Sequence, residues 1–284
     1  MTISTRRFQG ADGISLVADV GGPEEAPTVI LAHGGGQTRH SWSGAMQRLI
    51  DEGYHVINFD ARGHGESDWV SDGDYSLRAQ ASDLQMLTAT ASGPVALVGA
   101  SMGGASSLYA VGHHLVRSVR ALILVDIVLR PAAAGVEKIR KFMTANPDGF
   151  ATLEEAADAV AAYNPERPRP SDPKGLRKNL RLRDDGRLYW HWDPRMLAVS
   201  PSTEPPARTE ELIAASRGVT IPTLVIRGGH SDIVDDEGIA EMLRLVPQTE
   251  IYNVADAGHM VAGDRNDAFN TGAISFLRRH LPAV

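Results

Sequence analysis

The chain has 284 residues, of which 43% are hydrophobic, so it is long enough to bury the core of one large domain. Its formal charge of −7 at pH 7 argues against a nucleic-acid partner, which would require a basic surface. The absence of cysteine excludes disulfides, a thiol nucleophile and a thiolate-bound metal.

Short apolar runs alternate with helical patterns along most of the chain. The predicted strands are residues 14–20, 28–32, 55–59, 95–99, 121–125, 223–227 and 250–253, and the predicted helices are residues 43–52, 77–90, 102–115, 236–245 and 268–280. The later strands are continuously apolar, which is typical of parallel strands covered on both faces. The alternation predicts a mostly parallel sheet with right-handed crossovers that begins with an antiparallel pair.

This alternation is interrupted between residues 131 and 218. The interval holds most of the prolines and a cluster of arginines, and it includes a helical pattern at residues 152–163. We interpret residues 131–218 as a cap inserted over the C-terminal edge of the sheet, where α/β active sites collect. Residues 1–130 and 219–284 then form the core domain.

A G-x-S-x-G pentad, residues 99–103, follows the apolar run at residues 95–98 directly. It places Ser101 where a buried strand turns sharply into a helix, as in a nucleophile elbow. Glycines at both ends suit this turn because side chains there would crowd the strained backbone of the serine. Three further pieces occur in the order that serine catalysis needs: the glycine-rich segment at residues 33–36, then Asp232, and finally His259.

On these segments the chain resembles the α/β-hydrolase superfamily over nearly its whole length. The resemblance also rests on Ser41-Trp42 and on the runs DARGHGES at residues 60–67, GGHSD at 228–232 and AGH at 257–259. It implies an α/β fold with a mostly parallel eight-stranded sheet flanked by helices and a cap after the sixth strand. The chain is most similar to the capped branch of esterases, lactonases, perhydrolases and carbon–carbon bond hydrolases. Epoxide hydrolases and haloalkane dehalogenases have an aspartate at the elbow and are excluded by Ser101.

The resemblance implies a role for each candidate residue. Ser101 is the nucleophile, His259 the general base and Asp232 the acid that orients the histidine, because Asp232 follows the strand at residues 223–227 in the family's usual acid turn. Asp126, at the end of the preceding strand, is the alternative acid, since some members of the family carry the acid there. The backbone N–H groups of Gly35 and Met102 are the expected oxyanion donors.

The predicted activity is hydrolysis of a carboxylic ester or lactone through an acyl-enzyme. One alternative is a carbon–carbon bond hydrolase acting on a ring-cleavage product, although the usual elbow of that group has asparagine where this chain has Ala100. A second alternative is a non-catalytic small-molecule receptor on the same fold. No nucleotide fingerprint or set of metal ligands is evident, so we expect no cofactor and no metal.

The N-terminal segment lacks the apolar stretch of a signal peptide, and no run approaches the roughly 20 apolar residues that span a membrane. We therefore expect a cytoplasmic protein that acts on a small molecule without a membrane or nucleic-acid partner. A homo-oligomer is compatible with the sequence, which leaves the oligomeric state open.

Overall fold

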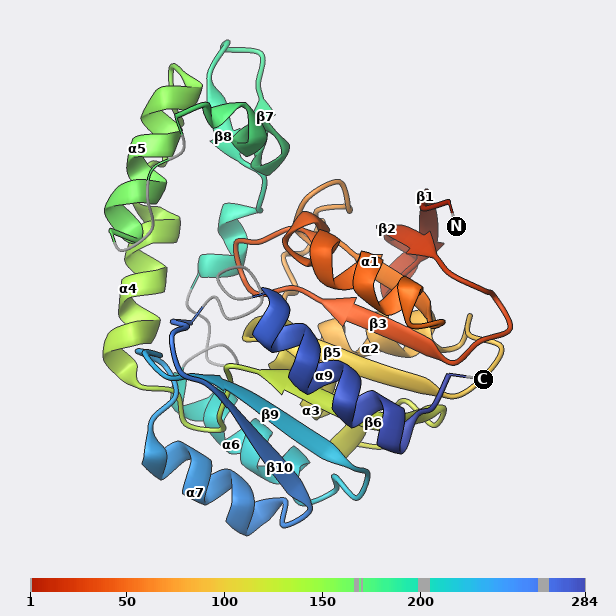
Figure 1. Cartoon of the computed structure of the whole chain (residues 1–284). Coiled ribbons are helices and arrows are strands. Elements are labelled where there is room, and N and C mark those ends of the chain that lie inside the picture. Colours follow the sequence, from red (N-terminus) through yellow and green to blue (C-terminus); the bar gives the residue numbers. More distant parts are fainter. Residues whose placement is uncertain (1, 166–168, 170, 199–204, 260–265, 284) are drawn as a thin grey trace.

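A twisted sheet forms the centre of the molecule, and within the part of the chain that the structure describes it has eight strands (Figure 1). The computed structural model describes all residues except 1, 166–168, 170, 199–204, 260–265 and 284. The strand order is β1-β2-β4-β3-β5-β6-β9-β10. The strands are β1 Ser4–Gln9, β2 Ser15–Gly21, β3 Thr28–Ala32, β4 His55–Phe59, β5 Val95–Ala100, β6 Val119–Val125, β9 Thr223–Gly228 and β10 Thr249–Val254.

The sheet is antiparallel at one edge and parallel elsewhere. Strand β2 pairs antiparallel with both β1 and β4, and the remaining neighbours are parallel. This confirms the predicted fold class. Strand β1 is absent from the predicted runs because it is an exposed edge strand, with the polar sequence STRRFQ and no buried residue.

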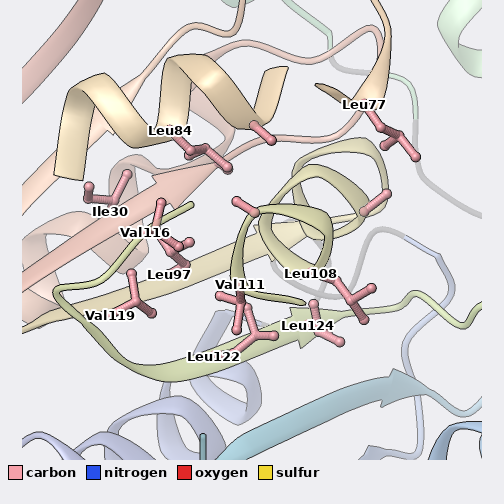
Figure 2. Close-up of a cluster of buried hydrophobic side chains, with 14 of the residues drawn as sticks. Ile30, Leu77, Leu84, Leu97, Leu108, Val111, Val116, Val119, Leu122 and Leu124 are labelled. Atoms are coloured by element: carbon pink, nitrogen blue, oxygen red, sulfur yellow. The ribbon is translucent and has the colours of Figure 1, made fainter. Parts of the chain in front are cut away.

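Helices cover both faces of the sheet and bury two separate apolar clusters. The helices are α1 Ser43–Asp51, α2 Leu77–Thr88, α3 Met102–Gly112, α6 Pro205–Ser216, α7 Asp236–Leu245 and α9 Asn266–His280. Side chains alternate between the faces along each strand, so Ile30 of β3 joins the cluster under α2 and α3, whereas Val29 and Leu31 join the cluster under α1 and α9. Figure 2 shows the first cluster, where side chains of α2 and α3 meet those of β5 and β6.

The segment predicted to form a cap, called the cap below, has an apolar cluster of its own. It contains α4 Ala133–Thr144, α5 Leu153–Tyr163 and the antiparallel hairpin β7 Leu180–Leu182 with β8 Leu188–Trp190. Its buried members are Met143, Phe150, Ala156, Leu180, Leu188, Trp190 and Trp192. Figure 1 shows these elements beside the edge at which the parallel strands end. Short 3₁₀ helices occur at Ala11–Gly13 and Arg39–Trp42 of the core and at Pro173–Asn179 and Pro194–Leu197.

Helix α6 lies inside the interval assigned to the cap from the sequence, but it packs with the core. Leu212, Ile213 and Ala215 belong to the same apolar cluster as α3. A Cβ atom on Gly112 of α3 would lie 2.0 Å from the carbonyl oxygen of Ala215, so the two helices approach each other closely. We therefore place the end of the cap before α6 rather than at residue 218.

Candidate active site

Ser101 lies in the sharp turn between β5 and α3. Its backbone has φ 45° and ψ −110°, a strained conformation for a residue other than glycine. A Cβ atom on Gly99 would lie 2.4 Å from the carbonyl oxygen of Gly103, and one on Gly103 would lie 2.4 Å from that of Ala32. Both flanking positions therefore require glycine, and the turn has the geometry expected of a nucleophile elbow.

The glycine-rich loop after β3 lies against this elbow. Its chain reverses at Gly36, which has φ 73°, and the N–H of Gln37 donates to the carbonyl oxygen of Gly34 over 3.1 Å. A Cβ atom on Gly34 would lie 3.6 Å from the Cβ of Ser101, and one on Gly35 would lie 3.9 Å from the Sδ of Met102. The structure thus brings together the loop, the serine and the first residue of α3.

Among the described residues, the backbone N–H groups of Gly35 and Met102 have no acceptor at this junction, whereas their neighbours are occupied. The N–H of Gly34 donates to the side-chain oxygen of Gln37 over 2.9 Å, and that of Gly36 donates to Nε2 of His64 over 3.1 Å. Among the hydrogen bonds of the described residues, none uses the N–H of Gly35. Met102 is the first residue of α3, so its N–H has no acceptor within the helix. These are the two groups predicted as oxyanion donors.

His259 lies in the loop after β10, where its Nδ1 contacts Oδ2 of Asp126 at 2.7 Å. Asp126 follows β6 directly and is only 1% exposed, and its backbone has φ 49°. The same Oδ2 accepts a hydrogen bond from Oγ of Ser231 at 2.6 Å, and Oδ1 accepts one from the N–H of Gly228 at 3.0 Å. The N–H of Ser101 donates to the carbonyl oxygen of Val125, so the nucleophile candidate is tied to the residue before Asp126.

The predicted contact between Asp232 and His259 is wrong. Oδ2 of Asp232 instead forms an exposed ion pair with Nζ of Lys138, a residue of α4, over 2.9 Å. The turn at residues 231–234 explains this difference: the neighbouring Ser231 directs its hydroxyl toward Asp126, and its Oγ also accepts the N–H groups of residues 233 and 234. This turn points the next side chain, Asp232, toward the cap. The alternative acid, Asp126, occupies the position that orients the histidine.

Three further histidines surround the glycine-rich loop, and each is fixed in one neutral tautomer. Nε2 of His33 accepts the N–H of Ala61, Nε2 of His64 accepts that of Gly36, and Nδ1 of His191 accepts that of Gly65. A ring nitrogen that accepts a hydrogen bond carries no proton, so the other nitrogen of each ring is the donor. The rings of His33 and His64 are 4.9 Å apart, and those of His64 and His191 are 5.7 Å apart.

Burial is the main reason why these rings stay neutral. Desolvation lowers the pKa of His33, and it lowers that of His64 well below the usual value, where His33 and His191 act in the same direction. Desolvation also lowers the pKa of His191 to about 3, with a smaller contribution from the nearby His33. Asp60, which lies close to His33, opposes its shift.

Because these buried histidines are neutral in the folded protein, we predict that the folded state loses stability steeply in mild acid. The pKa of each ring is lower in the folded protein than its unfolded value of about 6.5. The folded state therefore has its full stability above about pH 6.5 and loses stability as the pH falls from there toward the folded-state pKa. We expect the free energy of unfolding to fall by about 2 kcal/mol between pH 7 and pH 5 for each histidine that stays neutral in the folded protein. Urea titrations at the two pH values measure this loss.

A matched pair of variants assigns the effect to the buried rings. His191→Gln removes one buried titratable group and should reduce the difference between pH 7 and pH 5, whereas the exposed His113→Gln should leave it unchanged. Equal stability of the wild-type protein at both pH values would contradict the prediction.

A buried carboxylate organises the loop that follows β4. Asp60 is 0% exposed and accepts hydrogen bonds from the backbone N–H groups of Arg39 and Glu66, and from Nη1 of Arg39. Burial raises the pKa of Asp60, but the backbone N–H donors of Arg39 and Glu66 and the positive charge of Arg39 outweigh it, so the pKa is lowered overall. The charged run at residues 60–67 is therefore part of the scaffold that supports the glycine-rich loop.

The cap reaches this same loop. A Cβ atom on Gly36 would lie 3.3 Å from Cε of Met143 and 3.5 Å from Cζ3 of Trp192, both members of the cap's apolar cluster. The wall next to the candidate oxyanion loop is therefore apolar and partly aromatic. Among the described residues, no group of three or more His, Cys, Asp or Glu side chains could hold a metal ion, and no helix is long and apolar enough to cross a membrane.

Comparison with known proteins agrees with this geometry. The sequence model of the alpha/beta hydrolase fold family matches residues 27–265. The chain belongs to the α/β-hydrolase family. Its sequence is 30% identical over 254 residues to the esterase Rv0045c of Mycobacterium tuberculosis, a match that covers 84% of this chain and 79% of the relative. A crystal structure of that esterase superimposes with a TM-score of 0.76, at 26% identity and covering 98% and 92% of the two chains.

Two further proteins extend the comparison. The chain is 27% identical over 253 residues to a 3-hydroxybutyrate-oligomer hydrolase of Cupriavidus necator, covering 84% of each. The crystal structure of an E-2-(acetamidomethylene)succinate hydrolase has a TM-score of 0.84 at 23% identity, covering 97% and 99% of the two chains, and this likeness shows the fold alone. The named relatives place the chain among the hydrolases of the esterase-like branch.

Proposed function

We propose that this protein hydrolyses a carboxylic ester or lactone through an acyl-enzyme formed on Ser101. The observation that carries the proposal is the arrangement of four segments that each follow a parallel strand of the sheet. They are the strained turn at Ser101, the glycine-rich loop, in which no described hydrogen bond uses the N–H of Gly35, the buried Asp126 after β6, and His259 after β10, whose ring contacts Asp126. The named relatives support hydrolysis of ester bonds.

In the first half of the reaction, Oγ of Ser101 attacks the substrate carbonyl carbon and its proton passes to Nε2 of His259. That nitrogen is available because Nδ1 carries the proton that is donated to Asp126. The negative charge moves to the carbonyl oxygen, which accepts hydrogen bonds from the N–H groups of Gly35 and Met102. Collapse of the tetrahedral intermediate breaks the ester C–O bond, and the leaving alcohol takes the proton from Nε2.

Water completes the cycle. It attacks the acyl carbon while His259 removes its proton, and His259 returns that proton to Oγ of Ser101 as the second tetrahedral intermediate collapses and the acid leaves. The carboxylate of Asp126 stabilises the imidazolium in both halves. Ser231 and the N–H of Gly228 donate hydrogen bonds to this carboxylate and hold it in place.

A substrate screen on the intact protein tests the proposal. The screen contains p-nitrophenyl esters of increasing acyl length, lactones, and dienoates of the kind produced by aromatic ring cleavage. We expect turnover of esters or lactones, and stoichiometric labelling by a fluorophosphonate at Ser101 as mapped by peptide mass spectrometry. Turnover of dienoates alone would favour a carbon–carbon bond hydrolase, and labelling without turnover of any class would favour a receptor.

We also propose that the cap, from residue 131 to the start of α6, selects the substrate. Trp190 and Trp192 stack with ring centroids 5.0 Å apart, and Cζ3 of Trp192 lies 3.5 Å from where a Cβ atom on Gly36 of the glycine-rich loop would lie. We expect Trp192→Phe to change the ratio of long-chain to acetate ester turnover by about tenfold, since pocket contacts of this size discriminate by 1–3 kcal/mol. Trp190→Phe is the matched control and should change that ratio by less than about twofold.

Both variants remove a buried indole from the same cluster, so both should lower the thermal midpoint. The comparison therefore separates a loss of stability, shared by the two, from a change of specificity, expected of Trp192 alone. Identical substrate profiles for the two folded variants would exclude the cap as the specificity element.

A further inference from the structure

Residues 33–36 form a loop of which three successive peptide groups are each held by a different histidine. His33 donates from Nδ1 to the carbonyl oxygen of Gly34 over 2.8 Å, which belongs to the same peptide group as the N–H of Gly35. His64 accepts the N–H of Gly36 on Nε2 over 3.1 Å. His191 donates from Nε2 to the carbonyl oxygen of Gly36 over 3.2 Å. Each of these three peptide groups thus has an imidazole ring as a hydrogen-bond partner.

The third histidine is the only one of these three that comes from the cap. His191 follows β8, whereas His33 and His64 follow β3 and β4 of the core. Its second nitrogen accepts the N–H of Gly65 at 2.8 Å, so the ring bridges the loop after β3 and the loop after β4. The ring is 1% exposed and neutral, so its tautomer and its orientation are both fixed.

The surrounding cap segment is attached to the core at several points. Asp193 donates its N–H to the carbonyl oxygen of Gly63 over 2.8 Å, and its Oδ2 accepts the hydroxyl of Tyr75 at 2.6 Å. Arg181 donates to the carbonyl oxygen of Gly65 at 2.5 Å, and Nε1 of Trp69 donates to the backbone oxygen of His191 at 3.3 Å. These bonds make the segment around His191 a fixed support rather than a part of a moving lid.

We propose that His191 is a positioning residue that lets the cap hold the oxyanion donor of Gly35 in place. The proposal rests on the function proposed above. Donors for an oxyanion act only when they are aimed at the charge before it develops, and a small misplacement lowers the rate strongly. The cap therefore contributes to the rate of acyl transfer as well as to the choice of substrate, and its attachment at His191 must persist throughout turnover.

Two substitutions of the same residue separate the two hydrogen bonds of the ring. The amide oxygen of asparagine lies near the position of Nδ1, so His191→Asn keeps an acceptor for the N–H of Gly65 but loses the donor to Gly36. The longer glutamine places an amide nitrogen near the position of Nε2, so His191→Gln keeps the donor to Gly36 and loses the acceptor. Trp69→Phe is the matched control, because it removes a bond between the core and the same cap segment without affecting the ring.

We expect His191→Asn to lower kcat by about 10- to 100-fold with KM nearly unchanged, because the lost bond orients a group that acts in the transition state. The affinity for a trifluoromethyl ketone, which forms a tetrahedral adduct with serine, should fall by the same factor. His191→Gln and Trp69→Phe should stay within about threefold of the wild-type kcat. Rates are expressed per site labelled by fluorophosphonate, so that unfolded molecules do not contribute.

A His191→Asn protein with wild-type kcat per labelled site would overturn the proposal, as would equal losses in the Asn and Gln variants. The Ser101→Ala protein, which should lose labelling and turnover, distinguishes a failure of the proposed function from a failure of the role of His191. If that protein remains active, the proposed function fails, whereas if it is inactive and the His191 variants are normal, only the role of His191 fails.

Discussion

Ser101→Ala is expected to lower kcat by about 10⁴- to 10⁶-fold while the protein remains folded, as removal of a serine nucleophile does in other hydrolases. The substitution removes one oxygen atom and leaves the turn between β5 and α3 intact, since the backbone is held by the hydrogen bond from Ser101 N–H to Val125 and by the close approach of Gly99 and Gly103. Steady-state hydrolysis of the best ester from the screen measures the loss.

A second serine on the same helix provides the control. Ser106 lies in the first turns of α3 and donates to the carbonyl oxygens of Met102 and Gly103, so Ser106→Ala also removes a buried hydroxyl close to the elbow. We expect this variant to keep kcat within about tenfold and to retain fluorophosphonate labelling. Comparable activity in the Ser101→Ala protein, or a label that persists on another serine, would contradict the assignment of the nucleophile.

The sequence predicts this elbow well because the constraint is local. Gly99, Ser101 and Gly103 lie within five residues of sequence, and the clash that excludes a side chain at Gly99 arises within the turn, whereas the clash at Gly103 is with Ala32 at the end of β3. The oxyanion loop is equally local, because the turn at Gly36 needs a positive φ and the required glycines follow β3 directly. Short-range backbone geometry can be recognised from a pattern of residue types.

The acid could not be assigned in this way because two adjacent strands are each followed by a loop that contains an aspartate. Strands β6 and β9 are parallel neighbours, so Asp126 and Asp232 both emerge at the same edge of the sheet. Which of them faces His259 depends on the hydroxyl of Ser231, which contacts Asp126 across 105 residues of sequence. A preference set by one long-range hydrogen bond leaves no signal in the local pattern.

Parts of the interval between residues 131 and 218 could not be predicted from the sequence either, for a different reason. Helices α4 and α6 were not predicted, and they begin at the alanine-rich residues 132–134 and the proline pair at 205–206, where no clear apolar periodicity precedes them. The role inferred for His191 also lay outside the sequence argument, since its contacts with residues 36 and 65 exist only after the cap has folded onto the core.

Substitution of the acid that contacts His259 is expected to have the second large effect on kcat. We expect Asp126→Asn to lower kcat by about 10⁴-fold, because an amide in place of the carboxylate favours the wrong imidazole tautomer and leaves the imidazolium without a counter-charge. Asp232→Asn should change kcat by less than about threefold and stability by less than about 1 kcal/mol, since it removes only an exposed ion pair with Lys138. Ester hydrolysis at pH 8 compares the two variants.

Relocation of the carboxylate makes the test sharper than loss of activity alone. Oγ of Ser231 and Nδ1 of His259 contact the same oxygen of Asp126, so a carboxylate at position 231 would extend toward the histidine into the space that Asp126→Ala vacates. We expect the double variant Asp126→Ala, Ser231→Asp to be about 10- to 100-fold more active than Asp126→Ala. Asp232 is present in both proteins, so it cannot account for a gain. A larger loss from Asp232→Asn than from Asp126→Asn would return the acid to the loop after β9, and it would require that loop to rearrange so that Asp232 exchanges Lys138 for His259.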